Sequence, residues 1–146
     1  MPPVQRARRT AFTLAELLVV LGMMAVLACV ALPTAARARD ARATRAAIRE
    51  AAEAMALARD EALARRTMST AQVDTATGTI TVRANGRQVG RFTLGANHGV
   101  SLSVTRDSVA FDARGLGYGP ANLTLVARRA RAADTLVMSR LGRVRY

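Results

Sequence analysis

The chain has 146 residues, which is enough for one domain and a membrane anchor but not for two full domains. Its net charge is +12 and it contains arginine but no lysine, a balance that favours anionic partners such as nucleic acid or lipid headgroups. Aromatic residues are only 3% of the chain, which argues against a base-stacking surface, and the single cysteine, Cys29, excludes an intrachain disulfide.

The first predicted element is an apolar helix that follows a basic leader, residues 1–11. The apolar run from Phe12 to Leu32 would be about 31 Å long as a helix, close to the roughly 30 Å hydrocarbon core of a bilayer. Residues 12–33 are therefore predicted to form one transmembrane helix. Two alternatives stay open: a secretory signal peptide cleaved near residues 34–36, and a plain membrane anchor with no further role.

Glu16 is the feature of this helix that neither alternative explains. A charge at the centre of a bilayer costs on the order of 2.5–3.5 kcal/mol, and such residues usually mark a function. Nearer the end of the span the cost is smaller, and an acid that reaches for the interface is the simpler alternative. Glu16 is therefore a candidate functional residue.

The segment around Glu16 resembles the N-terminus of type IV prepilins and type II secretion pseudopilins. In that family a short basic leader precedes the sequence Phe-Thr-Leu-Ile-Glu-Leu, and residues 12–17 read FTLAEL here. The resemblance implies that prepilin peptidase cuts between Ala11 and Phe12 and methylates the new amine of Phe12. Ala11 stands where the family normally has glycine. The resemblance further implies that Glu16 pairs with the N-terminal ammonium of a neighbouring subunit during assembly.

The orientation in the membrane does not follow from charge alone. The leader is basic, but five arginines also follow the span between residues 37 and 49, and the positive-inside rule counts both sides. The resemblance implies a cytoplasmic leader, a single pass through the inner membrane and a C-terminal domain in the periplasm. Pro33 stands where many pilins have a proline that ends or kinks the membrane helix.

Residues 34–68 are predicted to continue the helix out of the membrane, since alanine is frequent and glycine is absent. An apolar stripe at helical spacing is expected to pack against the following domain. Its members are Ile48, Ala52, Met55, Ala56 and Leu63. A basic helix lying on a membrane surface is the alternative, which the interspersed acids disfavour.

From residue 69 onward the pattern changes to short alternating runs between turn signals, which predicts a small antiparallel β domain over 69–146. Asn85-Gly86 between two such runs predicts a two-residue hairpin turn. The sequence GANHG, residues 95–99, is read as a break between strands, and the glycine-rich residues 114–122 as a long loop. The predicted fold is α+β and pilin-like: a long N-terminal helix packed on a small antiparallel β domain.

The C-terminal part resembles the GspH/FimT group of minor pseudopilins and minor pilins, through Phe111, Gly115 and the closing SRLGRVRY. The resemblance implies a minor pseudopilin of the type II secretion system that assembles with other pseudopilins. The alternative is a FimT-like minor pilin that binds DNA through a Gly-Arg-x-Arg motif, to which Arg143 and Arg145 correspond. Arg128, Arg129 and Arg131 form a second basic cluster, which is read as a solvated turn.

No enzymatic chemistry is predicted. His98 is the only histidine, and no motif places a serine or an acid beside it in the sequence. Metal sites need several histidine, cysteine or acidic ligands, and these do not cluster in the sequence. We therefore expect no catalytic residue, metal or cofactor, and a structural subunit as the function.

Overall fold

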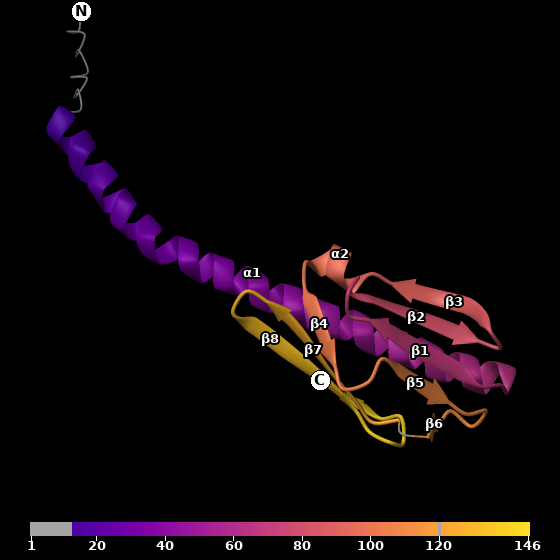
Figure 1. Cartoon of the computed structure of the whole chain (residues 1–146). Coiled ribbons are helices and arrows are strands. Elements are labelled where there is room, and N and C mark those ends of the chain that lie inside the picture. The colour runs from indigo at the N-terminus through magenta and orange to yellow at the C-terminus, as the bar shows by residue number, and fades with distance from the viewer. Residues whose placement is uncertain (1–12, 120) are drawn as a thin grey trace, which may run out of the picture. The chain divides into compact units, whose positions relative to one another are not determined.

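The computed structural model describes residues 13–119 and 121–146 (Figure 1). The chain divides into two compact units, Met1–Ala36 and Arg37–Tyr146. One helix, α1 (Leu14–Arg65), belongs to both units, and the β strands all belong to the second.

Helix α1 contains both the predicted membrane span and the predicted extension, with Pro33 inside it. Within the described residues it is the one helix long and apolar enough to cross a membrane, with a stretch of mean hydropathy 2.5 in which no residue is buried. The helix ends in a Schellman motif: Arg66 has φ 48°, its N–H donates to the Leu63 carbonyl, and the Thr67 N–H donates to the Ala62 carbonyl. Arginine rather than glycine therefore occupies the left-handed position.

The buried face of α1 differs from the stripe that the sequence predicts. Ile48 and Met55 are buried as expected, but Ala56 and Leu63 are exposed. The face is completed instead by small residues at spacings of three and four, which let the helix approach the sheets closely. These are Thr44, Ala47, Ala51, Ala54, Ala58 and Ala62.

The first sheet has five antiparallel strands in the order β3-β2-β1-β5-β6. Its strands are β1 (Ser69–Asp74), β2 (Thr79–Ala84), β3 (Arg87–Phe92), β5 (Ser108–Phe111) and β6 (Gly117–Tyr118). The β2–β3 hairpin confirms the Asn85-Gly86 turn. Both residues have positive φ, 51° and 74°, as a type I′ turn requires.

The second sheet has four antiparallel strands in the order β4-β7-β8-β9. Its strands are β4 (Ser101–Val104), β7 (Leu123–Arg129), β8 (Ala132–Met138) and β9 (Val144–Arg145). The closing run of the sequence is therefore divided: β8 ends at Met138, a turn follows, and β9 is a two-residue edge strand.

A short helix, α2 (Leu94–His98), replaces the break that the sequence predicts at residues 95–99. Leu94 is buried and anchors its start, while Gly99 ends it with φ 62°. The two glycines in this segment disguise the helix in the sequence, because glycine is a poor helix former.

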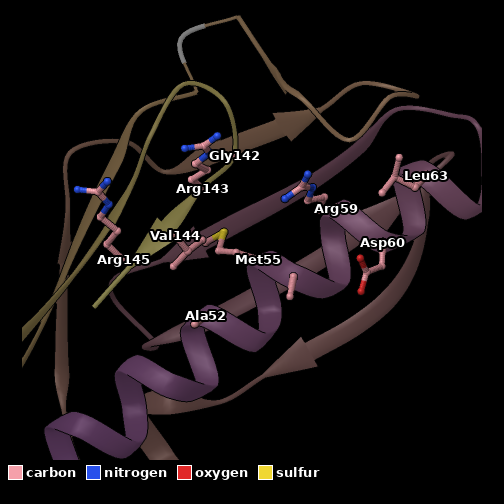
Figure 2. A pocket seen from close by; sticks show the side chains of 10 residues that line it. Ala52, Met55, Arg59, Asp60, Leu63, Gly142, Arg143, Val144 and Arg145 are labelled. Carbon is pink, nitrogen blue, oxygen red and sulfur yellow. The ribbon is translucent and has the colours of Figure 1, made fainter.

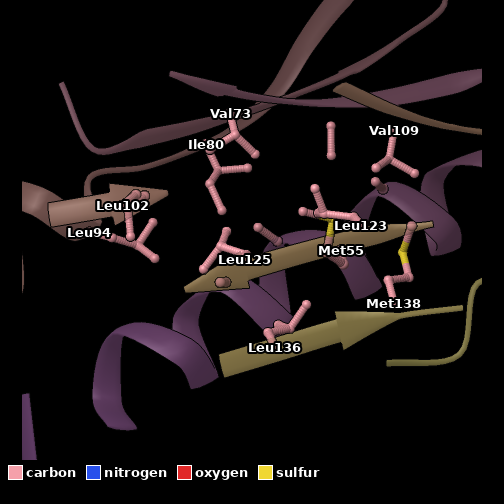
Figure 3. Close-up of a cluster of buried hydrophobic side chains, with 14 of the residues drawn as sticks. Met55, Val73, Ile80, Leu94, Leu102, Val109, Leu123, Leu125, Leu136 and Met138 are labelled. Carbon is pink, nitrogen blue, oxygen red and sulfur yellow. The ribbon is translucent and has the colours of Figure 1, made fainter. Parts of the chain in front are cut away.

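One hydrophobic core joins the C-terminal part of α1 to both sheets (Figure 3). Met55 of α1 lies in the same buried cluster as Ile80 of the first sheet and Leu123 and Leu136 of the second. Phe111 is the largest fully buried side chain. Among the residues that the structure describes, every buried hydrophobic one lies between positions 47 and 138, so the second unit has a complete core of its own. The predicted α+β fold, a long helix packed on antiparallel sheets, is confirmed.

Candidate functional site

At the N-terminus of α1, Glu16 forms a reciprocal capping box with Thr13. The Glu16 Oε2 accepts hydrogen bonds from the Thr13 N–H and the Thr13 hydroxyl, both at 3.0 Å. The Thr13 hydroxyl oxygen in turn accepts from the Glu16 N–H at 3.2 Å. The Thr-x-x-Glu spacing of a capping box is visible in the sequence, and the interpretation of Glu16 as an assembly charge missed this local role. Ala11 and Phe12 lie outside the described residues.

The apolar part of α1 exposes nearly all of its large side chains in this single chain, with exposed fractions from 49% at Val20 to 78% at Leu14. Burying one such side chain gives roughly 1.5–3 kcal/mol. Contact with lipid or with other apolar helices would therefore bury this surface favourably.

Two of the predicted site residues, Arg143 and Arg145, flank Val144 at the C-terminal edge of the second sheet. A tight turn places them: the Gly142 N–H donates to the Ser139 carbonyl at 2.9 Å, and the Arg143 N–H donates to the Ser139 hydroxyl at 3.2 Å. Both arginines are exposed, while Val144 is half-buried against the core. Arg143 precedes β9, so only Arg145 of the two arginines is a strand residue.

A groove of about 500 Å³ lies between α1 and the segment from Gly142 to Arg145, and we name it the α1–β9 groove (Figure 2). Its floor is apolar and its rim carries charges. The lining residues are Ala52, Met55, Ala56, Arg59, Asp60, Leu63, Gly142, Arg143, Val144 and Arg145.

Arg59 is the member of this groove with an unusual environment. Its Nε is buried and has no hydrogen-bond partner among the described residues. Figure 2 shows the side chain reaching from α1 toward the segment that carries Gly142 and Arg143. A buried guanidinium N–H without an acceptor is unfavourable, and Arg59 as a whole is only half-buried, so its guanidinium is the group in this groove that most lacks an acceptor.

A polar network joins α1, α2 and the end of β7. The Glu50 Oε2 lies 2.6 Å from the His98 Nε2, and the Glu50 Oε1 accepts from the Asn97 amide at 3.1 Å. Arg129 forms an ion pair with Asp40 at 3.0 Å and donates to the His98 carbonyl. No sequence motif places an acid beside His98, but the fold brings Glu50, which is 48 residues away in the sequence, into contact with it.

Arg129 also corrects the interpretation of the second basic cluster. Arg128 and Arg131 are exposed, as a solvated turn requires, but Arg129 is half-buried and bonded on two sides. Within the described residues, no group of three or more histidine, cysteine or acidic side chains is placed to hold a metal ion.

Comparison with protein families gives a match to the family described as Type II transport protein GspH, over residues 47–142. That range covers most of the chain and includes both sheets apart from β9. The chain belongs to the GspH family. The match begins after the apolar part of α1 and ends before Arg143, so it bears on neither Glu16 nor the two C-terminal arginines of this GspH family member.

Two solved structures have a similar fold, both of the type IV minor pilin FimU from Pseudomonas aeruginosa strain PAO1. Their TM-scores are 0.59 and 0.57, each at 17% sequence identity. The alignments cover 70% and 69% of this chain, and 86% and 90% of the FimU chains. A search of the curated proteins gave no significant match. The likeness to FimU shows a pilin-like fold for this GspH family member.

Proposed function

We propose that this GspH family member is a minor pseudopilin of a type II secretion system, which assembles through α1 into a periplasmic pseudopilus for protein export. The observation that carries the proposal is the division of α1. Its C-terminal part buries one face in a domain with a complete core, while its N-terminal part is apolar and has no buried residue. A helix of this kind is suited to the inner membrane first and to a bundle of like helices afterwards.

Processing by prepilin peptidase is part of the proposal. Cleavage between Ala11 and Phe12 removes the basic leader and leaves a methylated amine on Phe12. That amine carries a positive charge at the membrane end of the helix. The domain formed by residues 37–146 then lies in the periplasm, and the membrane is crossed once.

Glu16 supplies the complementary charge for assembly. In a helix bundle shielded from lipid and water, an unpaired carboxylate is costly. The capping box gives its oxygen hydrogen bonds but no opposite charge. The ammonium of Phe12 on a neighbouring subunit provides that charge, which fixes the axial position of one pseudopilin or pilin against the next.

A second candidate function is DNA binding, as in a FimT-like minor type IV pilin active in natural transformation. The exposed positions of Arg143 and Arg145 on either side of Val144 favour it. Guanidinium groups held this way can contact successive phosphates of a duplex without reading its sequence.

Two measurements in the native host test these functions. Intact mass of the membrane-extracted protein, with and without prepilin peptidase, is expected to show loss of residues 1–11 and gain of one methyl group only when the enzyme is present. Deletion of the gene is expected to abolish protein export while leaving DNA uptake unchanged. Unaltered mass contradicts processing, and the reverse deletion phenotype assigns the chain to DNA uptake.

A further inference from the structure

The α1–β9 groove combines the half-buried cationic side chain of Arg59 with an apolar floor, and two exposed arginines stand at its rim. Arg59, Arg143 and Arg145 line it against a single acid, Asp60. The floor includes Ala52 and Met55. The groove therefore matches a ligand that has both an apolar face and at least one carboxylate.

The buried Nε of Arg59 points to an acceptor that this chain does not supply. Among residues 13–119 and 121–146 no side chain or carbonyl accepts a hydrogen bond from it. A carboxylate is the best fit, because two parallel N–H donors of one guanidinium match its two oxygens.

The edge of the sheet suggests the conformation of the ligand. β9 is the last strand of the order β4-β7-β8-β9, and none of the groove's lining residues belongs to β8. The groove therefore opens between α1 and β9, which is an edge strand, and not between β9 and β8. Unpaired main-chain groups at such an edge accept an added extended segment.

The net positive charge of this protein indicates which kind of partner chain carries the segment. The protein has 22 basic residues against ten acidic ones, and only three of the arginines belong to residues 1–11. Two copies of it repel one another, so a second copy is a poor occupant. Nucleic acid suits the exposed rim but not the groove itself, whose lining includes Asp60 and an apolar floor.

We propose that the α1–β9 groove docks an acidic, extended segment of a different subunit of the same filament, with a carboxylate of that segment bound by Arg59. Alternate side chains of the segment face the apolar floor, and Arg143 and Arg145 attract its remaining acids. The proposal rests on the proposed function, because it takes a filament subunit as the partner. It adds the chemistry by which that partner is recognised.

The direct test uses the full chain in lipid nanodiscs and a fluorescent eight-residue peptide of alternating valine and glutamate. Fluorescence anisotropy is expected to show saturable binding, and the peptide with glutamine in place of glutamate is expected to bind at least about tenfold more weakly. Arg59→Gln is expected to lose a similar factor. Arg128→Gln, which removes an exposed arginine outside the groove, is the matched control and is expected to change the affinity less than about twofold.

Two further variants keep the test informative if Arg59→Gln alters folding. Ala56 is exposed and lines the groove, so Ala56→Glu is expected to occupy Arg59 from within the chain and to block the peptide. Ala64→Glu adds the same charge at an exposed helix position outside the groove and is expected to leave binding unchanged. Equal losses for Ala56→Glu and Ala64→Glu, or for Arg59→Gln and Arg128→Gln, overturn the proposal in favour of bulk charge. Equal binding of the glutamate and glutamine peptides overturns it as well.

A second readout separates this proposal from the proposed function. A photo-crosslinking residue at position 56 of the full chain in the native host is expected to capture another pseudopilin or pilin, and Arg59→Gln is expected to abolish that product. Normal incorporation into filaments with no such product overturns the groove proposal and leaves the proposed function intact. If the chain is absent from filaments altogether, the proposed function fails, while the peptide assay still tests the groove proposal. In the nanodisc assay, binding of duplex DNA but not of the peptide also overturns the groove proposal.

Discussion

Glu50 of α1 and His98 of α2 meet although 48 residues separate them in the chain, with the Glu50 Oε2 and the His98 Nε2 2.6 Å apart. The second oxygen of the same carboxylate accepts from Asn97. One acid on the long helix therefore holds the last two residues of the short one. Arg129 of β7, in the second sheet, donates to the His98 carbonyl and so also holds the end of α2.

We expect Glu50→Ala to loosen α2 from α1. The substitution leaves Asn97 and His98 without their acceptor, so the free energy of unfolding should fall by about 1–2 kcal/mol and the melting temperature by about 4–8 °C. Thermal unfolding followed by circular dichroism measures this. Glu53→Ala, at an exposed position on the same helix, is the control and should stay within about 0.5 kcal/mol. A Glu50 variant as stable as the control would show that other contacts hold α2.

The contact between Glu50 and His98 also shows where the sequence stops being informative. The long apolar helix and the Asn85-Gly86 hairpin could be predicted because each is encoded by neighbouring residues. The Glu50–His98 contact depends on how a helix lies on distant strands, and α2 was missed because two glycines interrupt its pattern. Neither has a local signature.

The helix face and the basic clusters illustrate a second limit. The prediction placed Leu63 on the buried face of α1 because its side chain is large and apolar. The buried face consists mainly of alanines instead, because the sheets lie close to the helix. Arg129 looked equivalent to Arg128 in the sequence, yet only Arg129 meets Asp40. The capping box of Thr13 and Glu16, by contrast, has a local signature in its Thr-x-x-Glu spacing, which the interpretation of Glu16 overlooked.

Asp112 gives the loop before β6 a pH dependence. Its Oδ1 accepts from the Leu116 N–H at 3.0 Å and from the Arg114 N–H at 2.9 Å, and its Oδ2 meets the Arg114 guanidinium. The hydrogen bond from Leu116, followed by those from Arg114, lowers the pKa of Asp112 below its ordinary 3.8. Because the pKa is lower in the folded state, the carboxylate stabilises the fold above pH 3.8 and loses this effect as the pH falls further.

Asp112→Asn is therefore expected to destabilise the protein at neutral pH and progressively less below pH 3.8. Melting temperatures of both proteins between about pH 6 and about pH 2 measure the difference. Asp74, whose pKa is lowered chiefly by the Thr77 hydroxyl, is unchanged in both proteins and cancels in the comparison. A difference in melting temperature that is constant across this range would contradict the assignment.

Gly142 fixes the turn that presents Arg143. It has φ 75°, and a Cβ added there would lie 3.1 Å from the Phe111 Cε1. Gly142→Ala is expected to reduce the free energy of unfolding by about 2–3 kcal/mol, through backbone strain and crowding of a buried ring. Gly86→Ala is the matched control, since Gly86 has φ 74° but open space around it, and it should lose only the strain of about 1–2 kcal/mol. Chemical denaturation of both variants separates the two effects, and equal losses would mean that Phe111 moves aside freely.

The DNA-binding alternative predicts a defined salt dependence. If Arg143 and Arg145 each contact one phosphate, replacing both with glutamine should weaken duplex binding and flatten the slope of log K against log salt by roughly two units. The control is Arg128→Gln with Arg131→Gln, two exposed arginines on another turn. Arg129 does not serve as a control because it pairs with Asp40. Filter binding at several salt concentrations measures the slopes. Equal effects of the two double substitutions would indicate that DNA binding depends on bulk charge. If the protein does not bind duplex DNA at physiological salt, the DNA-binding alternative fails and only the proposed secretion function stands.

The two roles of Glu16 can be separated by Glu16→Gln. Glutamine keeps an oxygen for the Thr13 N–H and hydroxyl, so it retains the capping box, but it cannot neutralise the ammonium of a neighbouring subunit. Glu16→Leu removes both functions and makes the span more apolar, which should leave membrane insertion intact or improved.

If Glu16 acts through its charge, both variants should enter the membrane normally, and the yield of this subunit in sheared filaments should fall to a similar low level for each. If the capping box is the whole role, Glu16→Gln should assemble like the natural chain and only Glu16→Leu should fail. Membrane fractionation checks insertion, and quantitative immunoblotting of sheared filaments measures assembly. Normal assembly of both variants would contradict both roles and leave Glu16 as an acid at the membrane interface.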